Sequence, residues 1–141
     1  MKKLYTLLLL SCFMSLPAAA EQCKTNFSSK GSFFKGKKFE SWAEFEGISS
    51  ASAFKKISQQ IAKDGWKITN SDKELGIISA GQDVSYGNGK VAPLNVIIEE
   101  VTTESGSNTK ISINYSISGG VSSPKKAVIE SFCTTINAAK P

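Results

Sequence analysis

Residues 111–118 alternate strictly between apolar and polar side chains, and this pattern constrains the fold more than any other in the chain. Ile111, Ile113, Tyr115 and Ile117 share one face of the expected strand, and the serines and asparagine between them share the other. Successive side chains of a strand point to opposite faces of a sheet. The pattern therefore predicts an antiparallel sheet with one face covered by other elements and one face in contact with solvent.

Four further segments are expected to be strands of the same sheet. They are residues 37–48, 66–69, 76–80 and 91–101. The first of them alternates clearly, with Phe39 and Phe45 on one face and Trp42 on the other. Turn-forming residues separate the last three of these segments from one another and from residues 111–118, as antiparallel neighbours require.

Two segments have helical spacing. In residues 49–64, Phe54, Ile57 and Ile61 form one stripe; Ser49 or Ser50 is the expected N-cap, and Gly65 suits the position after the helix. In the second helix, the stripe consists of Val128, Phe132 and Ile136. Its expected N-cap is Ser122 or Ser123, with Pro124 near the first helical position.

The order strand, helix, four strands, helix predicts a two-layer α+β domain over residues 37–141. We expect an antiparallel sheet of about five strands with two helices packed on one face, the β-α-β4-α order. Residues 21–36 contain three serines, two glycines and Asn26 as turn or loop formers, and they are expected to form an irregular N-terminal arm.

The first 20 residues are typical of a secretory signal peptide. Lys2 and Lys3 precede an apolar run, and Pro17 is followed by three alanines, so we expect cleavage after Ala20 and a periplasmic protein. The apolar run ends before the roughly 20 residues that a membrane-spanning helix needs. The alternative is a lipoprotein anchored through Cys12, because the sequence Leu-Leu-Ser-Cys that ends there loosely resembles a lipobox.

The charged residues exclude several kinds of chemistry. All 17 basic residues are lysines, histidine is absent, and 12 acidic residues leave a net charge of +5, which falls to +3 once the signal peptide is removed. Without histidine there is no His-assisted nucleophile and no histidine metal ligand. Without arginine and with this mild charge, no nucleic-acid partner is expected. No cofactor, metal site or catalytic residue is predicted, and we expect a protein that is not an enzyme.

Export and the cysteine count together predict one structural disulfide. Removal of Cys12 with the signal peptide leaves Cys23 and Cys133, an even number in an oxidising compartment. No CxxC motif is present that would indicate a redox role. Closing so long a loop contributes ~4–5 kcal/mol to stability in the chain-entropy description.

Two surfaces are candidates for contact with partners. The polar side of the alternating strand, Ser112, Asn114 and Ser116, is a possible partner surface for an envelope protein. The second candidate is a set of lysines interleaved with Phe33, Phe34 and Phe39, which would contact an anionic lipid or polysaccharide. The lysines of this set are Lys30, Lys35, Lys37 and Lys38. The simpler interpretation is a solvated arm whose phenylalanines fold back onto the core.

The segment 54–80 resembles a known type of domain. Its pattern is Phe54-x-x-Ile57-x-x-x-Ile61-x-x-x-Gly65-Trp66-x-Ile68, followed by Asp72-x-x-x-Gly76-Ile77-Ile78-x-Ala80. This is similar to small envelope domains of Gram-negative bacteria, such as those of the outer-membrane assembly lipoprotein BamC, and to uncharacterised periplasmic proteins. The resemblance implies a helix-grip fold of β-α-β4-α order and brings no catalytic residues with it.

These observations favour a non-enzymatic periplasmic binding or scaffold protein of the bacterial envelope. One alternative is a periplasmic inhibitor or immunity protein that blocks a toxin or hydrolase, with a loop such as residues 82–92 entering a cleft. A further alternative is a carrier of a small apolar ligand, with Trp42, Trp66 and Tyr115 lining its pocket.

Overall fold

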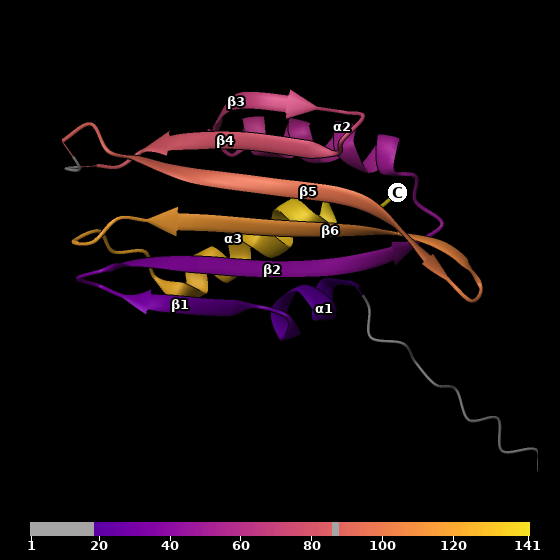
Figure 1. Ribbon diagram of the computed structural model, residues 1–141, viewed down its shortest axis with the longest axis horizontal. Coiled ribbons are helices and arrows are strands. Elements are labelled where there is room, and N and C mark those ends of the chain that lie inside the picture. Colours follow the sequence, from indigo (N-terminus) through magenta and orange to yellow (C-terminus); the bar gives the residue numbers. More distant parts are fainter. Residues whose placement is uncertain (1–18, 86–87) are drawn as a thin grey trace, which may run out of the picture.

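The structure, a computed structural model, describes residues 19–85 and 88–141. Within them, three helices accompany one antiparallel sheet with the strand order β1-β2-β6-β5-β4-β3 (Figure 1). The elements in chain order are α1 (Ala19–Thr25), β1 (Ser28–Ser32), β2 (Gly36–Glu46), α2 (Ser50–Lys63), β3 (Lys67–Asp72), β4 (Ile77–Asp83), β5 (Val91–Thr103), β6 (Gly106–Ile117) and α3 (Lys125–Asn137). Most of the expected signal peptide, including Cys12, lies outside the described residues.

The α+β class with a single antiparallel sheet is confirmed, but the expected numbers of strands and helices are wrong. The sheet has six strands instead of about five, and three helices replace two. Both additional elements, α1 and β1, involve residues 21–36, for which the sequence predicts an irregular arm. All five residues of β1 are exposed, so the sequence of this strand has no apolar alternation from which a strand could be predicted. It forms because its backbone pairs with β2, from Ser28 opposite Glu40 to Ser32 opposite Gly36.

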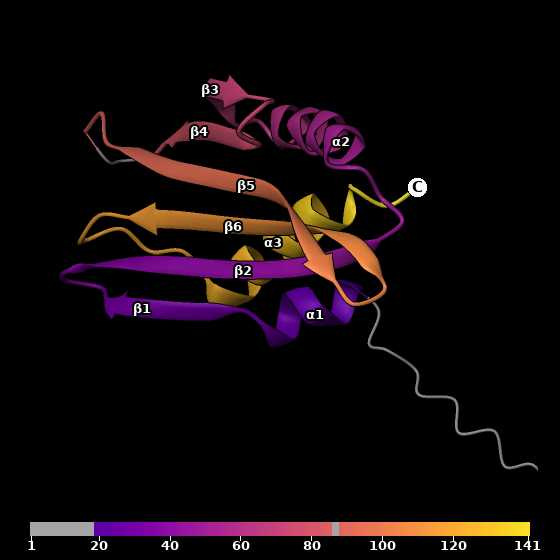
Figure 2. The ribbon, with the colours of Figure 1, turned by 45° about the vertical axis from the view of Figure 1, so that its right-hand side comes forward.

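The core lies between the sheet and the helices. α2 and α3 cover one side of the sheet, and α1 lies at the edge beyond β2, against α3 (Figure 2). The buried residues of the two long helices are Ala53, Ile57, Ile61, Val128, Phe132, Cys133, Thr135 and Ile136. The alternation predicted for β6 is confirmed, since Ile111 and Ile113 are buried on this side. β5 contributes Leu94 and Val96 in the same way. Among the described residues, no helix has the length and apolar character needed to cross a bilayer.

The helix ends follow the predictions only in part. Ser49 caps α2, with its side-chain oxygen accepting a hydrogen bond from the backbone N–H of Ser52 at 3.2 Å. The N-cap predicted for α3 is wrong, because Pro124 occupies the cap position and no side chain bonds to the first turn. The Ser123 hydroxyl lies 3.3 Å from the Tyr115 hydroxyl instead. The Ser123 side chain is thus engaged in a tertiary contact and does not cap the helix.

α1 takes the place of a strand along the outer half of β2. β1 pairs with β2 only as far as Glu40, and beyond that point α1 lies beside β2. The side-chain oxygen of Gln22 accepts a hydrogen bond from the Glu44 backbone N–H at 3.0 Å, and the Asn26 amide donates to the Trp42 carbonyl at 3.1 Å. These two amides satisfy backbone groups of β2 that a neighbouring strand would otherwise pair with.

The predicted disulfide is present and joins α1 to α3. Cys23 and Cys133 have their Cα atoms 5.6 Å apart, with 110 residues of sequence separation between them. Both cysteines are buried, and the Ser41 hydroxyl of β2 donates a hydrogen bond to the Cys23 carbonyl. A helix of 7 residues is too short to be stable by itself. The bridge and these hydrogen bonds therefore account for the position of α1.

Candidate interaction surface

The side of the sheet that faces away from α2 and α3 is here called the outer face. It carries a row of four residues on four strands, three of them apolar, which we call the apolar row. Antiparallel pairing places residues of neighbouring strands directly opposite one another. The pairing brings into line Trp42 of β2, Ser112 of β6, Ile97 of β5 and Ile77 of β4. Trp42 is 37% exposed and Ile97 is 41% exposed. Ser112, Asn114 and Ser116 alone would indicate a uniformly polar outer face. The exposed Trp42 and Ile97 show that it is partly apolar.

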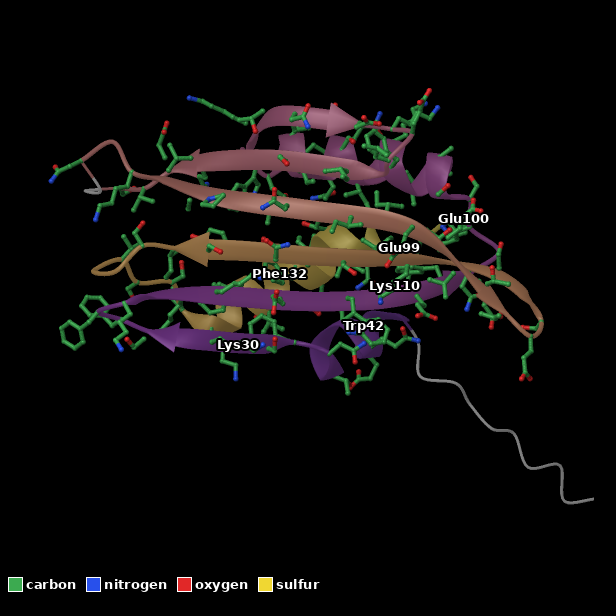
Figure 3. All side chains as sticks on the ribbon, viewed as in Figure 1. Lys30, Trp42, Glu99, Glu100, Lys110 and Phe132 are labelled. Atoms are coloured by element: carbon green, nitrogen blue, oxygen red, sulfur yellow. A yellow bond between two sulfur atoms is a disulfide. The ribbon has the colours of Figure 1, made fainter. Side chains whose placement is uncertain are left out.

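A charged row lies beside the apolar one. Glu44, Lys110 and Glu99 stand opposite one another on β2, β6 and β5. The Lys110 ammonium lies 5.0 Å from the centroid of the Trp42 ring and 3.9 Å from a Glu99 carboxylate oxygen. Figure 3 shows Trp42, Lys110 and Glu99 close together on this face. An ammonium held over an aromatic face attracts the ring electrostatically, so Lys110 helps to fix the orientation of Trp42.

A polar row lies on the other side of the apolar one. The Ser79 hydroxyl donates to the side-chain oxygen of Asn95 at 2.9 Å, and the Asn95 amide donates to the side-chain oxygen of Asn114 at 3.4 Å. The structure thus places all three residues of the predicted partner surface on the outer face of β6. Asn114 is engaged by Asn95, whereas Ser112 lies in the apolar row and Ser116 lies opposite Lys38.

A hollow of about 280 Å³ adjoins Trp42 at the edge of the outer face. It is lined by Gln22, Thr25, Asn26, Trp42 and Glu44. Gln22 and Thr25 belong to α1 and Asn26 follows it directly, so the hollow exists only because α1 is held against β2. Sequence reasoning missed this feature. It also left Ile97 and Ile77 out of the partner surface, although the alternation of residues 91–101 places Ile97 on the outer face.

The lysines and phenylalanines predicted to contact an anionic surface do not all lie together, because some are exposed at the β1–β2 hairpin and one is in the core. Phe39 is 1% exposed and belongs to the core, as the simpler interpretation expects. Phe33 and Phe34 do not fold back, because they lie in the turn between β1 and β2 and are 46% and 87% exposed. Lys30 and Lys38 lie directly opposite each other on the two strands of this hairpin.

The three aromatic residues proposed to line an apolar pocket do not meet. Trp66 and Tyr115 pack edge to face, with ring centroids 5.5 Å apart, against the core. Trp42 lies on the outer face of the sheet. The loop proposed to enter a cleft is also shorter than expected, since residues 82–83 belong to β4 and residues 91–92 to β5.

A cleft of about 380 Å³ lies where the β4–β5 connection meets the β6–α3 connection. Its lining consists of Gln82, Asp83, Val84, Ser85, Ala92, Tyr115, Gly120, Val121, Ser122 and Ser123. Hydroxyl, amide and carboxylate groups make up much of this lining, so the cleft does not have the character of a pocket for an apolar ligand. Within the described part of the chain, no three cysteine, aspartate or glutamate side chains converge to hold a metal ion.

In comparison with known proteins, the sequence matches no family and no curated protein.

Proposed function

We propose that the protein is a non-enzymatic binding or scaffold module of the bacterial envelope, which docks on an exported partner protein through the outer face of its sheet. The observation that carries this proposal is the apolar row of Trp42, Ile97 and Ile77 on a sheet face that α1, α2 and α3 leave uncovered. Covering the exposed parts of Trp42 and Ile97 with another apolar surface would be favourable.

The chemistry of the outer face favours a protein as the partner. Centres of protein interfaces are enriched in tryptophan and apolar side chains, and polar and charged groups surround them. The apolar row has this arrangement, with the row of Glu44, Lys110 and Glu99 on one side and the hydrogen-bonded asparagines on the other. The hollow beside Trp42 is a place for an anchoring side chain of the partner.

The dimensions of the outer face also fit a protein interface. Six strands span about 24 Å, and a strand as long as β2 extends about 36 Å. A standard interface buries about 800 Å² on each partner, which this area can supply. The expected export and the resemblance of residues 54–80 to envelope domains support a partner in the same compartment. A form cleaved after Ala20 and a lipoprotein attached through Cys12 would both meet it there.

Photo-crosslinking in intact cells tests the proposal. A photoreactive amino acid is placed at Ile97 on the outer face, and in a matched strain at Gln59, an exposed position of α2. We expect a specific adduct with an envelope protein from position 97 and none from position 59. Absence of an adduct from position 97, or equal labelling from both positions, would contradict the proposal.

A substitution pair separates a docking surface from a merely exposed one. Ile97→Glu introduces a charge into the apolar row, and we expect it to reduce recovery of the crosslinked partner from a nearby outer-face position at least tenfold. Leu75→Glu is the control, because Leu75 is 68% exposed but lies in the turn between β3 and β4. Thermal unfolding of both variants checks that the fold is retained.

A further inference from the structure

We propose that the β1–β2 turn binds the surface of an anionic phospholipid bilayer. Phe33 and Phe34 would enter the lipid interface, and the lysines of the hairpin would contact lipid phosphates. This site is separate from the outer-face row of Trp42, Ile97 and Ile77 and does not depend on the function proposed for it.

The aromatic pair at the turn is the first observation. Phe34 is 87% exposed and Phe33 is 46% exposed, and their rings contact each other edge to face with centroids 5.5 Å apart. In contrast, Phe39 and Phe132 are almost completely buried in the core. Two adjacent aromatic rings at the tip of a hairpin can enter the boundary between headgroups and acyl chains without disturbing the rest of the fold.

The backbone of the turn is fixed in the conformation that presents these rings. The Gly120 N–H donates a hydrogen bond to the Phe33 carbonyl at 2.8 Å, which ties the turn to the β6–α3 connection. The Lys35 N–H donates to the Ser32 hydroxyl oxygen at 3.3 Å. Because the turn is already ordered, little conformational entropy is lost when it enters a bilayer.

The lysines of the hairpin supply charge complementary to anionic lipids. Lys30 lies directly opposite Lys38, and like charges in this position destabilise a sheet. Glu40 neutralises Lys38, but among the described residues Lys30, Lys35 and Lys37 form no ion pair. These three ammonium groups are therefore available to an anionic surface.

The distribution of charge along the molecule gives the orientation of the contact. Figure 1 shows that the β1–β2 turn, the β4–β5 connection and the β6–α3 connection lie at one end of the sheet, and the β3–β4 and β5–β6 turns at the other. Lys90, Lys125 and Lys126 belong to the first end by their places in the chain. Glu74 and Glu104 belong to the second, which also carries Lys73, and Asp83 belongs to the first. An anionic bilayer would therefore attract the hairpin end more strongly than the opposite end.

Vesicle co-sedimentation tests the proposal, with the protein purified after export. The vesicles contain phosphatidylglycerol with phosphatidylethanolamine in one series and phosphatidylcholine alone in the other. We expect binding to the anionic vesicles to be at least tenfold tighter than to the neutral ones. It should weaken as salt is raised, because the screening length falls from about 30 Å at 0.01 M to about 8 Å at 0.15 M.

Two sets of variants separate the aromatic and the charged contributions. Phe33→Ser with Phe34→Ser should weaken binding to anionic vesicles at least tenfold. Replacement of Lys30, Lys35 and Lys37 by glutamine should weaken it about fivefold for each lysine. The controls are Leu75→Ser and Lys73→Gln in the β3–β4 turn, which should leave binding unchanged.

Several outcomes would overturn the proposal. The first is no binding to anionic vesicles at low salt, and the second is unchanged vesicle binding of the phenylalanine variant. The third comes from a competition experiment in which dextran sulfate displaces the protein from vesicles: the variant and the native protein bind dextran sulfate equally tightly. The last result would indicate a site for a soluble polyanion such as a polysaccharide.

Phe34→Trp gives a readout that does not rely on loss of binding. Its fluorescence should be quenched by brominated phosphatidylglycerol beyond the quenching of the native protein, and no added quenching would contradict insertion.

Discussion

The Lys38 ammonium lies 2.6 Å from the Glu40 carboxylate, two residues away on the same face of β2. The hydrogen bond from Lys38 lowers the pKa of Glu40 below its ordinary value of 4.5, and the charge of Lys30 on the neighbouring strand adds to the effect. The two side chains are 52% and 37% exposed, so solvent screens the pair and its contribution to stability is small.

Lys38→Gln should raise the pKa of Glu40 toward the ordinary value, which carboxyl-carbon NMR titration measures. Because the pKa is lower in the folded than in the unfolded chain, the native pair stabilises the fold above the unfolded pKa. That contribution disappears as the pH falls through the folded pKa. Lys67→Gln, which removes the 3.5 Å pair with Asp83, is the control and should leave Glu40 unchanged. An unaltered Glu40 titration in Lys38→Gln would contradict the assignment.

Reduction of the Cys23–Cys133 bridge should destabilise the protein strongly. The bridge closes 110 residues of separation, and loss of the constraint on the unfolded chain costs up to ~4–5 kcal/mol. Chemical denaturation with and without reductant measures the difference in the free energy of unfolding. The variant with both cysteines replaced by serine should be equally destabilised and insensitive to reductant. A fully reduced native protein with unchanged stability would show that the bridge contributes nothing.

The side-chain amides of Gln22 in α1 and of Asn26 directly after α1 should each contribute measurably to the stability of the sheet edge. Gln22→Ala and Asn26→Ala each remove one hydrogen bond to the backbone of β2, at a cost of about 0.5–1.5 kcal/mol. In Gln22→Ala the Glu44 N–H loses its acceptor, so hydrogen exchange at that amide should become faster. Gln59→Ala on the exposed side of α2 is the control. Unchanged exchange at Glu44 would mean that α1 does not protect this edge.

Two glycines with left-handed backbones should differ sharply when replaced by alanine. Gly65, with φ of +84°, has open space around the position of a Cβ atom. Gly65→Ala should therefore lower the free energy of unfolding only by the energy of a left-handed backbone at alanine, about 1–2 kcal/mol. Gly76, with φ of +68°, has the Ile98 carbonyl oxygen 2.0 Å from that position. Gly76→Ala must therefore also displace β5. Denaturant unfolding of both variants measures the difference, and equal losses of stability would contradict the close approach.

Local periodicity explains which parts of the fold were predictable. The alternation around Ile113 and the helical stripe of Ile57 and Ile61 reflect burial against the same core, and both are visible in the sequence. α1 and β1 carry no such periodicity, because pairing with β2 and the link to α3 hold them in place. Segments that depend on contacts distant in the sequence therefore escape pattern reasoning.

The residues of the candidate interaction surface were predictable only strand by strand. Alternation places Trp42 and Ile97 on the outer face, but the two residues belong to strands that are not neighbours. Only the registers of β2 with β6 and of β6 with β5 bring them into one row through Ser112. The sequence likewise cannot indicate that Phe33 and Phe34 stay outside the core, because Gly120 holds their turn through a tertiary hydrogen bond.

The way in which α1 closes the edge of β2 also bears on self-association. An open sheet can add strands from other chains wherever a long row of backbone groups is unpaired. The amides of Gln22 and Asn26 occupy that row beyond β1. At the opposite edge, β3 is short and its register shifts between Ile68 and Asn70. Within the described residues, the edge strands β1 and β3 are both short and neither edge is a long, regular template for strand addition, so Trp42 and Ile97 can stay exposed without the chain growing into strand-linked polymers.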